Sequence, residues 1–204
     1  MNMNNEKNVM KENEKDNLII KEPSIKSKNF NIVLIAMLTA LCISVSYILS
    51  PLANIELMSF IIFISGFIFG LTVGIGVGTM ASLIYYGWNP YGPSNPPIFI
   101  ACVLCMVLFG VIGGIMRKKD NDKLEYSAWN VYKFGTVGLL LTLLFDLTTN
   151  IITGFIFYGG NVIIALVLGI PFLLIHTISN TAVFSGLLIP VVNAIKNLNQ
   201  FNKV

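Results

Sequence analysis

The sequence predicts an all-α integral membrane protein: a bundle of six transmembrane helices with both termini in the cytoplasm. Three observations carry this prediction: 55% of the 204 residues are apolar, only 11% are charged, and the mean hydropathy is +0.77. A soluble domain carries about 25% charged residues, because its surface faces water. The composition therefore excludes a soluble enzyme and a nucleic-acid-binding protein.

The charged residues are concentrated outside the apolar segments. Residues 1–29 hold 11 of them and residues 117–133 hold eight, whereas Glu56 and Asp146 stand alone within the apolar part of the chain. The polar segment 1–29 contains too little apolar surface to form a core, so we expect a flexible cytoplasmic tail there. Residues 196–204 are expected to form a second cytoplasmic tail.

The apolar runs between the tails define a membrane domain over residues 30–195. About 20 residues cross a bilayer as a helix. Run lengths therefore predict helices at about 30–50, 55–69, 71–88, 98–116, 133–158 and 162–195. The last run is longer than one span, and we expect Pro171 and Pro190 to kink or end it.

Lysine and arginine positions decide how the run over 57–88 is divided. Cytoplasmic loops collect these residues, and here they cluster at 26–28, 117–119 and 196–203. If all three clusters lie inside, the crossings between the first two must be even in number. Four crossings use every apolar run, provided that a break falls near Gly70. All 13 cations then face the cytoplasm.

Polar residues inside the last two predicted helices are the strongest indication of function, because they are costly in a membrane. Asp146 and Asn150 lie one turn apart, as do His176 and Asn180. By helix rise, Asp146 and His176 lie roughly 18 and 21 Å from the outer surface, so they can meet across antiparallel helices. Three interpretations stay open for this pair. It is an internal contact that locks two helices together, the polar wall of a ligand cavity, or a proton-relay or hydrolase site.

The outer segment 88–97 is rich in proline and therefore stiff. It offers stacking faces and amide groups, on Trp88, Asn89, Tyr91 and Asn95. Such a loop suits the capture of a flat polar ligand, because little entropy is lost on ordering it. The alternative is a belt of aromatic residues at headgroup depth. Asn54 and Glu56 are expected near the same opening.

Small residues recur at helical spacing in two places. Glycines occur every fourth residue from Gly66 to Gly78, and we interpret them as helix-packing positions. Ala36 and Ala40 either pack within the bundle or dock another membrane subunit.

The three cysteines lie in apolar helices and are interpreted as packing residues, so no metal site is predicted. The sequence contains no H-E-x-x-H, G-x-S-x-G or phosphate-binding-loop motif, so we predict no catalytic residue and expect any ATP to be bound by other subunits.

Over residues 30–195 the chain resembles the substrate-binding S component of energy-coupling factor (ECF) vitamin transporters. The resemblance rests on the small six-helix chain with both ends inside and on the order and spacing of short motifs. These motifs are Ala36-x-x-x-Ala40, Asn54-Ile55-Glu56, the glycine-rich helices, the NPYGPSNP loop, and the DLTTN and HTISN stretches that begin at Asp146 and His176.

The resemblance implies a subunit that captures a water-soluble vitamin at the outer face of the cell membrane. It also implies docking through Ala36 and Ala40 on a transmembrane coupling subunit served by two cytoplasmic ATPase subunits, with release of the vitamin by toppling in the membrane. The implied substrate-binding residues are Asn54, Glu56, Trp88, Asn89, Tyr91, Asn95, Asp146, Asn150, His176 and Asn180. The alternatives are a non-catalytic membrane scaffold or assembly protein and an intramembrane enzyme that uses Asp146 and His176.

Overall fold

The computed structural model describes residues 25–52, 54–117 and 124–201. Most of the predicted tail over 1–29 and the last residues of the predicted tail over 196–204 lie outside these ranges. The chain divides into a unit of residues 1–31, described only where helix α2 begins, and a unit of residues 32–204 that contains everything discussed below.

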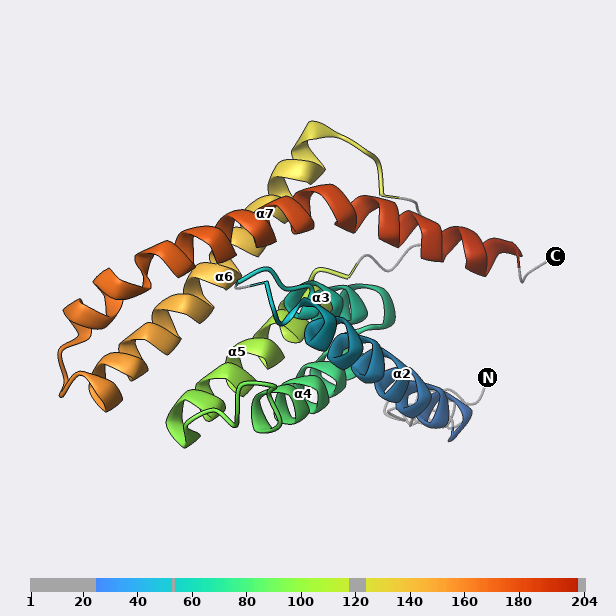
Figure 1. The fold of residues 1–204 in the computed structure, drawn as a ribbon. Coiled ribbons are helices and arrows are strands. Elements are labelled where there is room, and N and C mark those ends of the chain that lie inside the picture. The colour runs from blue at the N-terminus through green and yellow to red at the C-terminus, as the bar shows by residue number, and fades with distance from the viewer. Residues whose placement is uncertain (1–24, 53, 118–123, 202–204) are drawn as a thin grey trace, which may run out of the picture. The chain divides into compact units, whose positions relative to one another are not determined.

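The described residues form six helices and no strand, which confirms the all-α class (Figure 1). The helices are α2 (Ile25–Leu49), α3 (Met58–Phe69), α4 (Leu71–Gly87), α5 (Pro96–Ile115), α6 (Ala128–Phe157) and α7 (Val162–Phe201). Gly70 separates α3 from α4 and has a φ of 103°, a conformation that favours glycine. The long run over 57–88 is therefore two helices.

Four of the described helices are long and apolar enough to cross a membrane, namely Asn29–Leu49, Pro96–Ile115, Ala128–Phe157 and Val162–Asn197. Helices α3 and α4 have 12 and 17 residues. At 1.5 Å per residue they are roughly 18 and 26 Å long, shorter than a hydrocarbon core of about 30 Å. The six crossings and the cytoplasmic position of both termini stay predictions.

Helix α3 forms the centre of the 32–204 unit. Every residue from Met58 to Phe67 is buried, as expected for a helix that is apolar on all sides. It packs against α4, α5 and α7. The Phe63 ring stacks on Phe67 and meets the edge of Phe184 from α7. Because Glu56 directly precedes α3, this central helix also fixes where that carboxylate enters the bundle.

Glycines allow α3, α4 and α5 to approach to backbone contact. A Cβ atom built on Gly74 would lie 2.5 Å from the carbonyl oxygen of Gly110 and 2.7 Å from the Cα of Gly66. A Cβ on Gly66 or Gly110 would likewise collide with backbone. The packing interpretation of the glycine row is confirmed at these positions.

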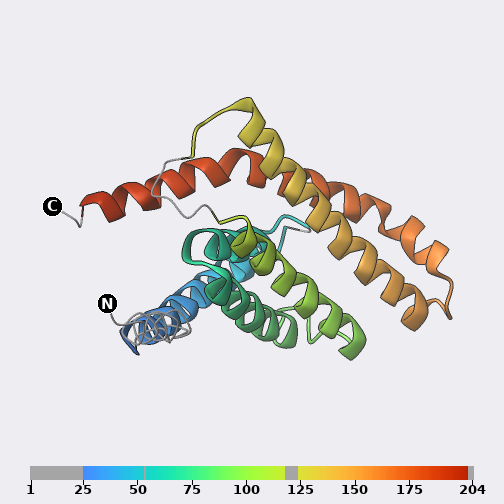
Figure 2. The same cartoon turned by 180° about the vertical axis from the view of Figure 1, so that it is seen from behind.

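Helices α6 and α7 form an antiparallel pair joined by a short turn, and they lie side by side in both views (Figures 1 and 2). Helix α6 begins at Ala128, five residues before the predicted start at 133. Pro171 and Pro190 were expected to kink or end the last helix, and both lie inside α7, which therefore does not end at either of them. Each proline removes one backbone hydrogen bond, and a helix this long absorbs the loss by bending, as Figure 1 shows for α7.

Candidate ligand-binding site

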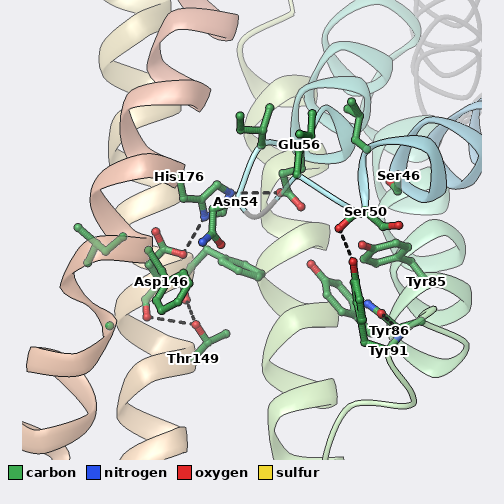
Figure 3. A pocket seen from close by; sticks show the side chains of 18 of the residues that line it. Ser46, Ser50, Asn54, Glu56, Tyr85, Tyr86, Tyr91, Asp146, Thr149 and His176 are labelled. Atoms are coloured by element: carbon green, nitrogen blue, oxygen red, sulfur yellow. Dashed lines mark hydrogen bonds and ion pairs between the residues drawn. The ribbon is translucent and has the colours of Figure 1, made fainter.

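A cavity of about 500 Å³ lies where the C-terminal ends of α2 and α4 face the middle of α6 and the first half of α7 (Figure 3). The segment between α2 and α3 and the beginning of the α4–α5 loop complete its wall. Its polar lining residues are Ser46, Ser50, Asn54, Glu56, Asn89, Asp146, Thr149, Asn150 and His176. Its aromatic lining residues are Tyr85, Tyr86, Tyr91, Phe145 and Phe172.

His176 joins two carboxylates at one side of the cavity. Its Nδ1 lies 2.8 Å from Oδ1 of Asp146, and its Nε2 lies 3.4 Å from Oε1 of Glu56. The imidazole is 4% exposed and Asp146 is 8% exposed, so both are held away from bulk water. The predicted meeting of Asp146 and His176 across antiparallel helices is confirmed. Glu56 joins them from the start of α3, which helix spacing alone did not predict.

A buried amide behind His176 orients the imidazole. The Nδ2 atom of Asn180 lies 3.2 Å from Nε2 of His176 and within 3.2 Å of the hydroxyls of Thr142 and Ser59. The ring of Phe145 meets the imidazole edge-on at a centroid separation of 5.8 Å. These contacts come from α3, α6 and α7, so they fix the imidazole relative to three helices at once.

The two carboxylates keep oxygen atoms without a hydrogen-bond partner in the described part of the chain. These atoms are Oδ2 of Asp146 and Oε1 of Glu56, and both are buried. Nε2 of His176 approaches Glu56 at 3.4 Å without forming a hydrogen bond. A buried carboxylate oxygen without a donor is unfavourable, because the lost hydration is not replaced. The acidic cluster therefore has more hydrogen-bond acceptors than donors.

Side-chain hydrogen bonds tie down the loops around the cavity. The Tyr91 hydroxyl donates to the carbonyl of Ser50 at 2.8 Å, and the Ser179 hydroxyl donates to the carbonyl of Asn54 at 3.0 Å. The Tyr47 hydroxyl donates to the carbonyl of Trp88. Asn54 has a φ of 58°, in the left-handed region that asparagine tolerates better than most residues. The α2–α3 and α4–α5 segments are thus held to one another and to α7.

Three tyrosines lie across the cavity from Asp146 and His176. Figure 3 shows Tyr85, Tyr86 and Tyr91 on the side opposite Asp146 and His176. Tyr85 and Tyr86 meet edge to face at 5.3 Å, and Tyr85 also contacts the Tyr47 ring at 5.8 Å. The cavity therefore has an acidic side and an aromatic side, which suits a small molecule with a polar end and a flat ring.

Seven of the ten predicted binding residues line the cavity: Asn54, Glu56, Asn89, Tyr91, Asp146, Asn150 and His176. Three do not. Trp88 is 75% exposed and is not part of the lining, although its carbonyl accepts from Tyr47. Asn95 precedes the first turn of α5, and Asn180 lies behind His176 rather than at the cavity surface.

Several lining residues were missed at the sequence level. They are Ser46, Ser50, Tyr85, Tyr86, Phe145 and Phe172. Ser46 and Ser50 are one turn apart at the end of α2, and the two tyrosines directly precede the proline-rich loop, so both pairs carried a signal. Phe145 and Phe172 carried none, because an apolar residue in an apolar helix shows nothing of the direction it faces.

Metal-binding and redox chemistry find no support in the described ranges. They contain no group of three histidine, cysteine or acidic side chains placed to hold a metal ion. Cys42, Cys102 and Cys105 are buried in helices and have free thiols. The ionisable residues that cluster at the cavity are therefore His176, Glu56 and Asp146.

A polar, aromatic-lined cavity within a bundle of long apolar helices defines a membrane protein that binds a small molecule. Residues 30–198 match the family described as ECF transporter, substrate-specific component. The chain belongs to this family and is a substrate-specific subunit of an ECF transporter, a multi-pass membrane protein rather than an enzyme. No curated protein and no solved structure matches it significantly.

Proposed function

We propose that this subunit captures a water-soluble vitamin at the outer face of the membrane and delivers it inward by toppling, driven by ATP hydrolysis in partner subunits. The observation that carries the proposal is the cavity, whose lining combines the carboxylates of Glu56 and Asp146 with three tyrosine rings (Figure 3). Six crossings with both termini inside would place the cavity and its anchored loops at the outer side, where substrate is captured. The outer loops would then carry no lysine or arginine whose burial opposes toppling.

The surface of α2 supports docking on a coupling subunit. Ala36, Ala40 and Ser44 are exposed at four-residue spacing, so they form one strip of small residues. Bulky neighbours such as Met37 and Ile48 are exposed as well. Small residues let another helix approach closely in a membrane. This strip is the proposed contact with the transmembrane coupling subunit, which in turn is served by two ATPase subunits.

Vitamin binding by the purified full-length chain tests the proposal. A thermal-shift panel of water-soluble vitamins should identify one that stabilises the protein, and the chain alone should not hydrolyse ATP. Transport should appear when the chain is reconstituted with a coupling subunit and two ATPase subunits. A folded chain that binds no vitamin and never co-purifies with such subunits would contradict the proposal.

A scaffold protein is the competing function, because His176 and Asp146 also hold α6 to α7. Under that alternative, Asp146→Asn lowers stability without changing uptake of any vitamin. Under the proposed function, the same variant loses uptake even when its amount in the membrane is restored. Uptake normalised to folded protein therefore separates the two.

A further inference from the structure

The charge of the cavity lining restricts which ligands it can hold. The ionisable groups that line it are the carboxylates of Glu56 and Asp146, the imidazole of His176 and three tyrosines. None of the described lining residues is a lysine or an arginine. When both carboxylates are ionised, the lining is negative whether His176 is neutral or protonated. An anionic ligand would meet repulsion in a site of low dielectric constant.

The cations that the structure describes within the 32–204 unit lie too far away to balance these carboxylates. Arg117 lies at the far end of α3, where Nη1 approaches the carbonyl of Phe69 at 3.4 Å. Lys133 precedes Asp146 by 13 residues on α6, and Lys196 follows His176 by 20 residues on α7. At 1.5 Å per residue these separations are roughly 20 and 30 Å. Among the described residues of the 32–204 unit, no cation balances the carboxylates, so a cationic ligand would supply charge that this part of the chain does not.

The acidic side of the cavity has fewer hydrogen-bond donors than acceptors. One imidazole serves both carboxylates, with a hydrogen bond to Asp146 at 2.8 Å and a looser contact to Glu56 at 3.4 Å. Oδ2 of Asp146 and Oε1 of Glu56 are left without hydrogen bonds in the described structure, and Asp146 is 8% exposed. Next to such carboxylates, a positively charged N–H group of a ligand is favoured over a hydroxyl, because charge-assisted hydrogen bonds are stronger.

The opposite wall of the cavity also favours a cationic ligand. Tyr85, Tyr86 and Tyr91 present ring surfaces on the side of the cavity away from Asp146. Aromatic faces attract organic cations and stack on flat rings. A cavity of about 500 Å³ accommodates one molecule of this size.

We propose that this site selects a small organic cation with an aromatic ring, whose positive end lies on the acidic side of the cavity, next to Glu56 and Asp146, and whose ring packs against the tyrosines. This inference rests on the proposed function and specifies its substrate class. The inference excludes, as substrates of this chain, vitamins that carry a carboxylate and no cationic group.

Titration calorimetry of the purified full-length protein with vitamins grouped by charge tests the inference. The probes are thiamine and pyridoxamine as cations, riboflavin and pyridoxine as neutral compounds, and biotin, pantothenate and nicotinate as anions. Pyridoxamine and pyridoxine share one ring and differ in an ammonium and a hydroxyl group, so they form a matched pair. The expected result is that a cation binds most tightly. Tightest binding of an anion or a neutral compound overturns the inference and leaves the proposed function standing.

Isosteric variants check the role of the carboxylates. Glu56→Gln and Asp146→Asn keep shape and remove charge, and each should weaken binding of the cation at least tenfold. Glu125→Gln is the matched control, because Glu125 is exposed and lies outside the cavity. If Glu56→Gln and Asp146→Asn bind the cation with the same affinity as Glu125→Gln, the inference is overturned. Binding of no probe by folded wild-type protein overturns the proposed function and the inference with it.

Discussion

The contact between His176 and Asp146 allows the most quantitative prediction about this protein. His176 is the only histidine in the sequence, and its Nδ1 lies 2.8 Å from Oδ1 of Asp146. Replacing it by alanine removes one partner of a buried pair and leaves the carboxylate without its donor. Loss of one partner from a buried pair costs about 3–5 kcal/mol. Because a cavity lies beside the pair, water reaches the carboxylate in the variant, and we expect the lower end, about 3 kcal/mol.

The two carboxylates should couple unequally to the imidazole. The Asp146 side chain is 11% exposed and shares a hydrogen bond with His176, so a double-mutant cycle should give a coupling free energy of about 1–3 kcal/mol. The Glu56 side chain is 21% exposed and contacts Nε2 at 3.4 Å without hydrogen-bond geometry. Its coupling to His176 should stay below about 1 kcal/mol.

Thermal unfolding in a fixed detergent measures these free energies. For a chain of this size, about 3 kcal/mol corresponds to a Tm lower by roughly 6–12 °C. Ser185→Ala is the control, because that exposed hydroxyl donates within its own helix to the carbonyl of Ala182 at 3.1 Å. It should change stability by less than about 0.5 kcal/mol. A coupling near zero for Asp146 with His176, or a larger one for Glu56, would refute the reasoning.

Three further predictions concern packing, the loops and docking. Gly74→Ala should destabilise the protein by about 1–3 kcal/mol in the same unfolding assay, since its Cβ would lie 2.5 Å from a backbone oxygen, whereas Gly186→Ala meets nothing within 4 Å and should not destabilise it. Tyr91→Phe should weaken ligand binding several-fold in calorimetry, because the hydrogen bond to the Ser50 carbonyl is lost, worth about 1 kcal/mol; unchanged affinity would show that this loop anchor is irrelevant. Ala40→Leu should abolish co-purification with a coupling subunit and preserve vitamin binding, while Ala194→Leu, at an exposed alanine of α7, should preserve both.

The sequence predicted the parts of the fold that depend on chain length and on the cost of charge in a membrane. Asp146 and His176 could be placed opposite each other, because helix rise fixes depth and antiparallel helices share a depth scale. The division at Gly70 followed from the number of crossings that the lysine and arginine clusters require. Both arguments use position along the helix axis, which a sequence determines well.

Features that depend on rotation about the helix axis could not be predicted. Phe145 lines the cavity and Leu144 beside it is exposed, yet both are apolar residues in one apolar helix. Trp88 was expected in the site because of its residue type. Its side chain is exposed instead, and only its carbonyl takes part in the loop contacts, by accepting a hydrogen bond from Tyr47. Pro171 and Pro190 were expected to kink or end the last helix; α7 continues through both and is bent (Figure 1).

Native mass spectrometry of the full-length chain, purified in the presence of a vitamin mixture, tests the central claim most directly. The account predicts one small-molecule adduct per chain, with a mass that identifies a cationic vitamin, and loss of that adduct in Asp146→Asn. The Glu125→Gln control should retain it. A folded wild-type chain without any adduct, or an adduct that Asp146→Asn retains in full, would contradict the account.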